Sequence, residues 1–173
     1  MRGKPDGPAP LVLTLALDAS SQRRFDAERR AHFPVGRTAV GAHVTLFHAL
    51  PDEHEGEVRG AVSAVAGARY PVRVAGLRSL GRGVAYALTS DRLDAQHAAL
   101  AGQLRPWLTR QDAQPFQAHV TIQNKVEPQQ ARALLARLSE TFAPWEAVAV
   151  GLSLWRYVGG PWEPVTTVAF TAQ

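Results

Sequence analysis

The segments Ala42-His43-Val44-Thr45-Leu46 and Ala118-His119-Val120-Thr121-Ile122 carry one pattern twice, and the rest of the chain is interpreted around them. Each is an apolar, β-branched run with a His and a Thr two positions apart. Because side chains alternate along a strand, the His and the Thr of each segment are expected on one face and the Val on the other. With six histidines in the chain, chance placement predicts about a third of one His-x-Thr triplet. The matching neighbours therefore favour a shared function for the two segments.

Each segment offers an imidazole, which exchanges a proton near neutral pH, and a hydroxyl that can hold an oxygen. Two such pairs in one chain predict a site with a paired acid and base. A single His beside a Thr on a strand is more often a half-buried pair that bonds to backbone, but duplication favours the catalytic interpretation. A metal site made of the two histidines is a weaker alternative, because two imidazoles are too few ligands and neither motif contains an acidic residue.

The two motifs resemble the paired His-x-Thr signatures of the two-histidine phosphoesterase superfamily, which contains 2′-5′ RNA ligase-like proteins and cyclic nucleotide phosphodiesterases. The longer strings HVTLFHALP (His43 to Pro51) and HVTIQNKV (His119 to Val126) are similar to the RNA ligase-like branch, and so is LWRYVGGPWE (Leu154 to Glu163). One difference precedes the second motif. Many relatives carry Arg-Pro there, whereas this chain has Gln117-Ala118.

The resemblance implies a metal-independent phosphoesterase that needs no cofactor, with His43, Thr45, His119 and Thr121 as its catalytic residues. The implied reaction is hydrolysis of a 2′,3′-cyclic phosphate, or reversible making and breaking of a 2′-5′ linkage, on RNA ends or a small nucleotide. Two alternatives stay open. One is a non-catalytic module that binds RNA ends or a nucleotide in the same cleft, and the other is an α/β protein with a purely structural or partner-binding role.

Strand alternation extends the site beyond the motifs. If both strands are regular, Phe47 follows His43 and Thr45 on one face, and Gln123 and Lys125 follow His119 and Thr121. Lys125 and Arg156 could neutralise phosphate, and aromatic residues could stack a base. The aromatic candidates are Tyr86, Trp155, Tyr157 and Trp162, with a core position favoured for Trp155. The histidines expected outside the site are His32, His48, His54 and His97, of which His48 has the opposite parity to His43.

Hydrophobic periodicity and turn residues predict two halves with the same order of elements: strand, helix, motif strand, helix, strand. Besides the motif segments, strands are expected over residues 11–17, 70–79, 84–89, 147–157 and 165–170, and helices over 18–32, 52–66, 90–104 and 128–140. The repeated order predicts an α+β fold of two lobes related by a pseudo-twofold axis. Each lobe is expected to have a mainly antiparallel sheet with helices outside, and the two motifs to face a central cleft.

The composition of the 173 residues, of which 46% are hydrophobic, is sufficient for one domain with a sizeable core. Residues 1–10, rich in Pro and Gly, are expected to form a flexible tail, and residues 11–173 a single domain. The chain has no Cys, which excludes disulfides and a thiolate nucleophile. No signal-peptide pattern or membrane-length apolar run is present, so a monomeric cytoplasmic protein without membrane contact is expected. A net charge of +4 slightly favours anionic partners such as RNA.

Overall fold

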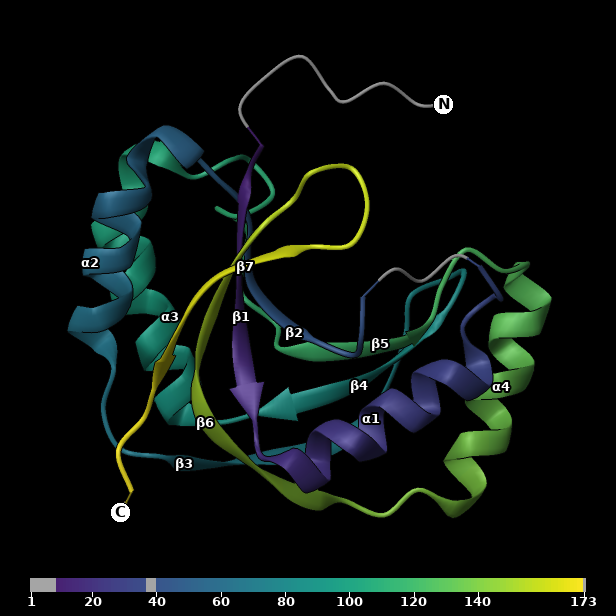
Figure 1. Ribbon diagram of the computed structural model, residues 1–173. Helices are drawn as coiled ribbons and strands as arrows, with labels where there is room; N and C mark the ends of the chain where they lie inside the picture. The colour runs from purple at the N-terminus through teal and green to yellow at the C-terminus, as the bar shows by residue number, and fades with distance from the viewer. Residues whose placement is uncertain (1–8, 37–39, 173) are drawn as a thin grey trace.

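Strand β6, Trp145–Arg156, is the longest strand and joins the two ends of the sheet. One edge of β6 pairs with β1 (Leu11–Leu17), and the other pairs with β3 (Tyr70–Ser79) and with β7 (Glu163–Ala169). The computed structural model describes residues 9–36 and 40–172, and within them all seven strands form one antiparallel sheet (Figure 1). The strand order is β2-β1-β6-β3-β4-β5, where β2 is Val44–Leu50, β4 is Val84–Thr89 and β5 is His119–Gln123.

The first and third helices begin at side chains that cap them. The carboxylate of Asp18 accepts a hydrogen bond from the amide of Ser21 at the start of the first helix, and Ser90 does the same for Leu93 at the start of the third. Figure 1 shows the second and third helices together on one side of the molecule and the first and fourth on the other. The helices are α1 (Ala19–His32), α2 (Glu55–Val65), α3 (Asp91–Leu104) and α4 (Pro128–Thr141), with 3-10 turns at Asp52–His54 and Arg105–Trp107.

The expected strands and helices are therefore confirmed, with ends that differ by at most three residues; the largest difference is at the start of α2, where residues 52–54 form a 3-10 turn. The expectation of a separate sheet in each lobe is wrong, because β6 pairs with strands from both halves of the chain. Most of the expected N-terminal tail, residues 1–10, lies outside the described residues. Within the described chain, none of the helices combines the length and the apolar character that crossing a membrane requires.

Both motif strands contain an irregularity at the same place. In the β1–β2 pair, Thr14 lies opposite Thr45, but the next pairing is Leu13 with Phe47. In the β4–β5 pair, Ala85 lies opposite Thr121, and the next pairing is Val84 with Gln123. One extra residue thus follows each His-x-Thr triplet, as in a β-bulge, and such an insertion reverses which face the following side chains occupy.

The two motif strands lie at opposite ends of the strand order, and the curled sheet brings them close together (Figure 1). Their inward side chains are fully buried at Val44 and Val120. The packing also crosses between the two halves of the sequence, since α1 packs on β5 and the His97 ring of α3 stacks on Phe47 of β2. The core thereby fixes the faces on which the polar residues of β2 and β5 lie.

Candidate active site

A cavity of about 150 Å³ lies between the two motif strands, and we refer to it as the central cavity. The four residues expected to be catalytic all line it, although they come from segments more than 70 residues apart. The wall consists of Val12, His43, Thr45, His48, His119, Thr121 and Trp162. Two imidazoles and two hydroxyls therefore share one small space.

Matching hydrogen bonds hold the two motif histidines. Nδ1 of His43 lies 2.8 Å from the carbonyl oxygen of Gly41, and Nδ1 of His119 lies 2.8 Å from that of Gln117. Because a carbonyl oxygen only accepts, Nδ1 carries the hydrogen in both rings. In the neutral form of each ring, Nε2 is then left with its lone pair and is able to take a proton.

The surroundings favour the neutral form of both motif histidines. Burial lowers the pKa of His43 to about 4, with the nearby charges of Arg29, His48 and His119 acting in the same direction. Burial also lowers the pKa of His119, assisted by Arg78 and His48. One arginine therefore lies near each histidine, and a bound anion would be stabilised by the same positive charges.

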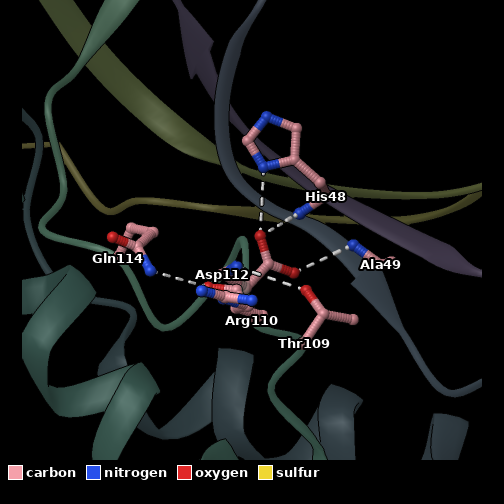
Figure 2. A network of polar contacts seen from close by, with 6 residues as sticks. All are labelled: His48, Ala49, Thr109, Arg110, Asp112 and Gln114. Atoms are coloured by element: carbon pink, nitrogen blue, oxygen red, sulfur yellow. Dashed lines mark hydrogen bonds and ion pairs between the residues drawn. The ribbon is translucent and has the colours of Figure 1, made fainter.

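His48 is a third imidazole in the central cavity, and the buried carboxylate of Asp112 holds it (Figure 2). Nδ1 of His48 lies 3.0 Å from Oδ1 of Asp112, which also accepts a hydrogen bond from the amide of His48. The other carboxylate oxygen accepts from the amide of Ala49, and the amide of Asp112 donates to the hydroxyl of Thr109. Burial acts to raise the pKa of Asp112, but the hydrogen bonds to its carboxylate together outweigh burial and lower the pKa overall.

Three further cavities open beside the central one. The tryptophan cavity, about 400 Å³, is lined by Trp155 and Trp162. The ring centroid of Trp162 lies 4.7 Å from that of His43. The lysine cavity, about 410 Å³, contains Lys125, Tyr157 and Trp162. The glutamine cavity, about 130 Å³, lies on the side of His48 and His119. The aromatic and cationic walls around the histidine pair are thus divided among separate spaces.

Two of the expected substrate-binding residues are buried behind the site. Phe47 is 0% exposed and stacks on the ring of His97, and Gln123 is 3% exposed. The prediction that they face the cleft is wrong, because the bulge after each triplet reverses the alternation on which it relied. The same bulge turns His48 toward the cavity, contrary to its expected parity. Oε1 of Gln123 is buried without a hydrogen-bond partner among the described residues.

Two other expected contacts are also wrong. Tyr86 is 8% exposed, donates its hydroxyl hydrogen to Glu28 and packs on Phe25, so its ring belongs to the core. Arg156 forms ion pairs with Asp52 and Glu55 at 2.8 and 2.6 Å, and it lines none of the cavities described above. The remaining histidines agree with a packing role, since His32 pairs with Glu28, His54 stacks on Trp107 and His97 lies between Phe47 and Phe116.

The sequence interpretation missed Arg29, Arg78, His48 and Asp112. The sequence does contain a signal for Arg29. It falls at helical spacing with Phe25 on the apolar face of α1, and a charged residue on such a face needs a partner. Its Nη1 donates to the carbonyl oxygen of Thr121 at 2.8 Å. For Asp112 and Arg78 no local pattern points to the site, since only the fold brings them to β2 and β5. Over residues 9–36 and 40–172, no three His, Asp or Glu side chains form a group that could hold a metal ion.

Solved structures of low sequence identity share this fold. A crystal structure of Escherichia coli LigT with 3′-AMP aligns with 95% of this chain and 99% of its own, at 19% identity and a TM-score of 0.64. TT0787 of Thermus thermophilus gives the same coverages at 15% identity and a TM-score of 0.68. A crystal structure of a phosphoesterase again gives these coverages, at 18% identity and a TM-score of 0.66.

Sequence comparison leads to the family. No curated protein sequence matches the chain. The profile of the 2′-5′ RNA ligase superfamily, however, matches residues 17–161, which include both His-x-Thr motifs and most of the chain. This match confirms the resemblance carried by the motifs, and the chain belongs to the 2′-5′ RNA ligase superfamily.

Proposed function

We propose that this protein is a metal-independent phosphoesterase that hydrolyses a 2′,3′-cyclic phosphate on an RNA end or a small nucleotide. The observation that supports the proposal is the central cavity, where His43, Thr45, His119 and Thr121 line a space of about 150 Å³. Membership of the superfamily supports the same class of reaction. The LigT structures contain 3′-AMP, ATP, NADP⁺ or phosphate, so nucleotides and phosphate are ligands of that protein.

In the proposed reaction, the neutral histidine takes a proton from water through Nε2 while the water oxygen attacks phosphorus. The bond from phosphorus to one ribose oxygen breaks, and the protonated histidine gives its Nε2 proton to that oxygen. The hydroxyls of Thr45 and Thr121 donate hydrogen bonds to the non-bridging oxygens as negative charge builds there. In the reversible variant, an RNA hydroxyl replaces water and a 2′-5′ linkage forms.

The cavities on either side of the histidine pair suit the rest of a nucleotide. Trp155 and Trp162 line the tryptophan cavity, and a nucleotide base can stack on an indole ring. In the lysine cavity, Lys125 and Arg29 supply positive charge toward a phosphate backbone. We assign the base to the first cavity, and to the second the RNA whose hydroxyl attacks in the reversible variant.

We also infer that the two halves of the domain formed by residues 11–173 arose by duplication. Three matching features support this inference: the repeated order of elements, the bulge after each triplet and the bond from Nδ1 of each histidine to the carbonyl two residues earlier. A pseudo-twofold axis between β2 and β5 would account for all three.

Incubation of the purified protein with 2′,3′-cyclic AMP and EDTA tests the function. The expected result is a nucleoside monophosphate, with the rate lowered about 100- to 10,000-fold in His43→Ala and in His119→Ala. His54→Ala is the matched control, because His54 stacks on Trp107 away from the cavity and its loss should leave the rate unchanged. Circular dichroism checks that all variants are folded. Undiminished turnover in either motif variant would refute the assignment.

The alternative is a module that binds RNA ends or nucleotides in this cleft without turnover. Both interpretations predict that adenosine nucleotides bind and that phosphate competes. Binding of the cyclic nucleotide with no product, in the presence or absence of added divalent metal, would favour the module.

A further inference from the structure

The glutamine cavity adjoins the central cavity and shares part of its wall. Thr45, His48 and His119 line both spaces. A ligand group in the glutamine cavity would therefore lie next to the phosphate that the proposed function places between the motif histidines. The side chains specific to the glutamine cavity include Arg78, Gln111, Gln114, Gln117, Phe116 and His97.

His48 presents a ring nitrogen of fixed position to this space. Its side chain is 44% exposed, whereas that of Asp112 is 0% exposed and holds Nδ1 of the ring (Figure 2). Because Nδ1 is held by the carboxylate, Nε2 is the ring nitrogen left for a ligand. An imidazolium donates from both ring nitrogens, so a carboxylate at Nδ1 and an anion at Nε2 can both accept hydrogen bonds from it.

Asp112 does not cancel the positive character of the cavity. Its carboxylate lies behind His48 and accepts hydrogen bonds from the amides of His48 and Ala49 as well as from the ring. Among the described residues, it is the only carboxylate that lines the cavity. The negative charge of Asp112 is thus compensated by the hydrogen bonds from the β2 backbone and from the imidazole.

Arg78 brings a second cation to the same cavity. It is a half-buried residue of β3, close enough to His119 to lower the pKa of that ring. No acidic partner for Arg78 is found in residues 9–36 and 40–172. A partly desolvated guanidinium without a carboxylate is well suited to bind an anion in a forked geometry.

We propose that the glutamine cavity is a second anion subsite, in which Arg78 and His48 bind the phosphate on the 5′ side of the ribose whose cyclic phosphate occupies the central cavity. The inference rests on the proposed function and narrows its substrate class. A single ribose separates these two phosphates, which agrees with two adjoining cavities that share three residues. The 5′ phosphate is either a terminal monoester or the diester that leads to the preceding nucleotide of an RNA.

Calorimetric affinities of product-like nucleotides test the subsite without any need for turnover. The probes are adenosine 3′-phosphate, adenosine 3′,5′-bisphosphate and the dinucleotide ApA with a 3′-phosphate. We expect the wild-type protein to bind a probe with the added 5′ phosphate about tenfold more tightly than adenosine 3′-phosphate. The gain should fall to nearly nothing in Arg78→Gln and decrease strongly in His48→Gln. It should persist in Arg73→Gln, which changes an exposed arginine of the same strand.

The outcomes separate the subsite from the reaction. If the bisphosphate binds more tightly than adenosine 3′-phosphate, the subsite accepts a terminal phosphate monoester. If only the dinucleotide binds more tightly, and the increase depends on Arg78, the subsite accepts a phosphodiester. Equal affinities for all three probes, or a gain that survives Arg78→Gln, would overturn the subsite even if the cyclic nucleotide is hydrolysed. An Arg78-dependent gain in a protein that hydrolyses no cyclic nucleotide would retain the subsite and reject the catalytic function.

Discussion

The base of the proposed reaction has to be a neutral histidine, and the surroundings of His43 favour its neutral form. Burial removes water from the ring, and Arg29, His48 and His119 make a further positive charge unfavourable. A bound phosphate reverses the second effect, because its negative charge stabilises an imidazolium. The free and the phosphate-bound site therefore differ in proton affinity, which suits the proposed reaction, in which one histidine is neutral and the other is protonated.

The lowered pKa of His43 predicts acid sensitivity of the fold. Between pH 6.5 and about 4 the unfolded chain binds a proton that the folded protein does not, so the free energy of unfolding falls as the pH decreases through this range and levels off below it. Urea denaturation of wild type and His43→Gln at pH 7 and pH 5 measures the effect. We expect wild type to lose about 2 kcal/mol more than the variant. Equal losses would show that His43 titrates normally.

The two threonines provide a test of transition-state stabilisation. Thr45→Val and Thr121→Val keep the shape of the side chain and remove the donor, so kcat for 2′,3′-cyclic AMP should fall on the order of 100-fold with little change in KM. Thr89→Val, at the exposed end of β4, serves as the control. If both motif variants keep the wild-type kcat, the hydroxyls do not stabilise the transition state.

At the level of the elements, the turn into β4 lies tightly against the end of β5. A Cβ at Gly83 would lie 1.9 Å from the carbonyl oxygen of Gln123 and 2.7 Å from Cα of Asn124. Both are backbone atoms, so they cannot rotate away as a flexible side chain would. Only glycine permits β5, and with it His119, to approach β4 at this point.

Gly83→Ala should therefore move β5 and lower the free energy of unfolding by about 3 kcal/mol. The rate of cyclic nucleotide hydrolysis should fall with it, because His119 and Thr121 are on the displaced strand. Gly76→Ala is the matched control, since a Cβ there would meet no atom within 4 Å. Thermal unfolding and initial rates are measured for both variants. A wild-type melting temperature for Gly83→Ala would contradict the predicted loss of stability.

The elements were predictable from the sequence because their signals are local. Each signal concerns residues that are neighbours in the sequence. Examples are the apolar run before Asp18, the N-cap at Ser90 and the turn at Gly81-Arg82-Gly83. The bulges were not predictable, because one inserted residue leaves the apolar character of the strand unchanged and alters only the parity after it. This is why the predicted faces of His43 and Thr45 are correct. Phe47, predicted to face the cavity, is buried, and His48, predicted to face away, lines the cavity.

At the scale of the whole molecule, one buried arginine connects the two halves. Arg29 of α1 is 7% exposed, and its Nη1 donates to the carbonyl oxygen of Thr121, which is 92 residues away in the sequence. Its guanidinium carbon also lies 4.2 Å from the ring centroid of Phe33. Such long-range contacts, like that of Asp112 with β2, are determined by the fold and could not be predicted from sequence spacing.

Arg29→Met should loosen this connection. The variant keeps an apolar stem but leaves the carbonyl of Thr121 without this donor, so we expect the free energy of unfolding to fall by about 2 to 3 kcal/mol. Arg30→Met changes the exposed neighbour on the same helix and should have little effect. Denaturant unfolding compares the two variants. If they are equally stable, the bond does not hold the halves together.

The position of β2 and β5 at the two ends of the strand order has a mechanical consequence. Each motif strand has a ladder partner on one side, β1 or β4, and within the described chain no ladder joins β2 to β5. Spreading these two rims apart would stretch side-chain contacts and leave every pairing of the sheet intact. In the proposed reaction, an RNA end can thus enter and its product can leave by a hinge-like widening that breaks none of the ladder hydrogen bonds.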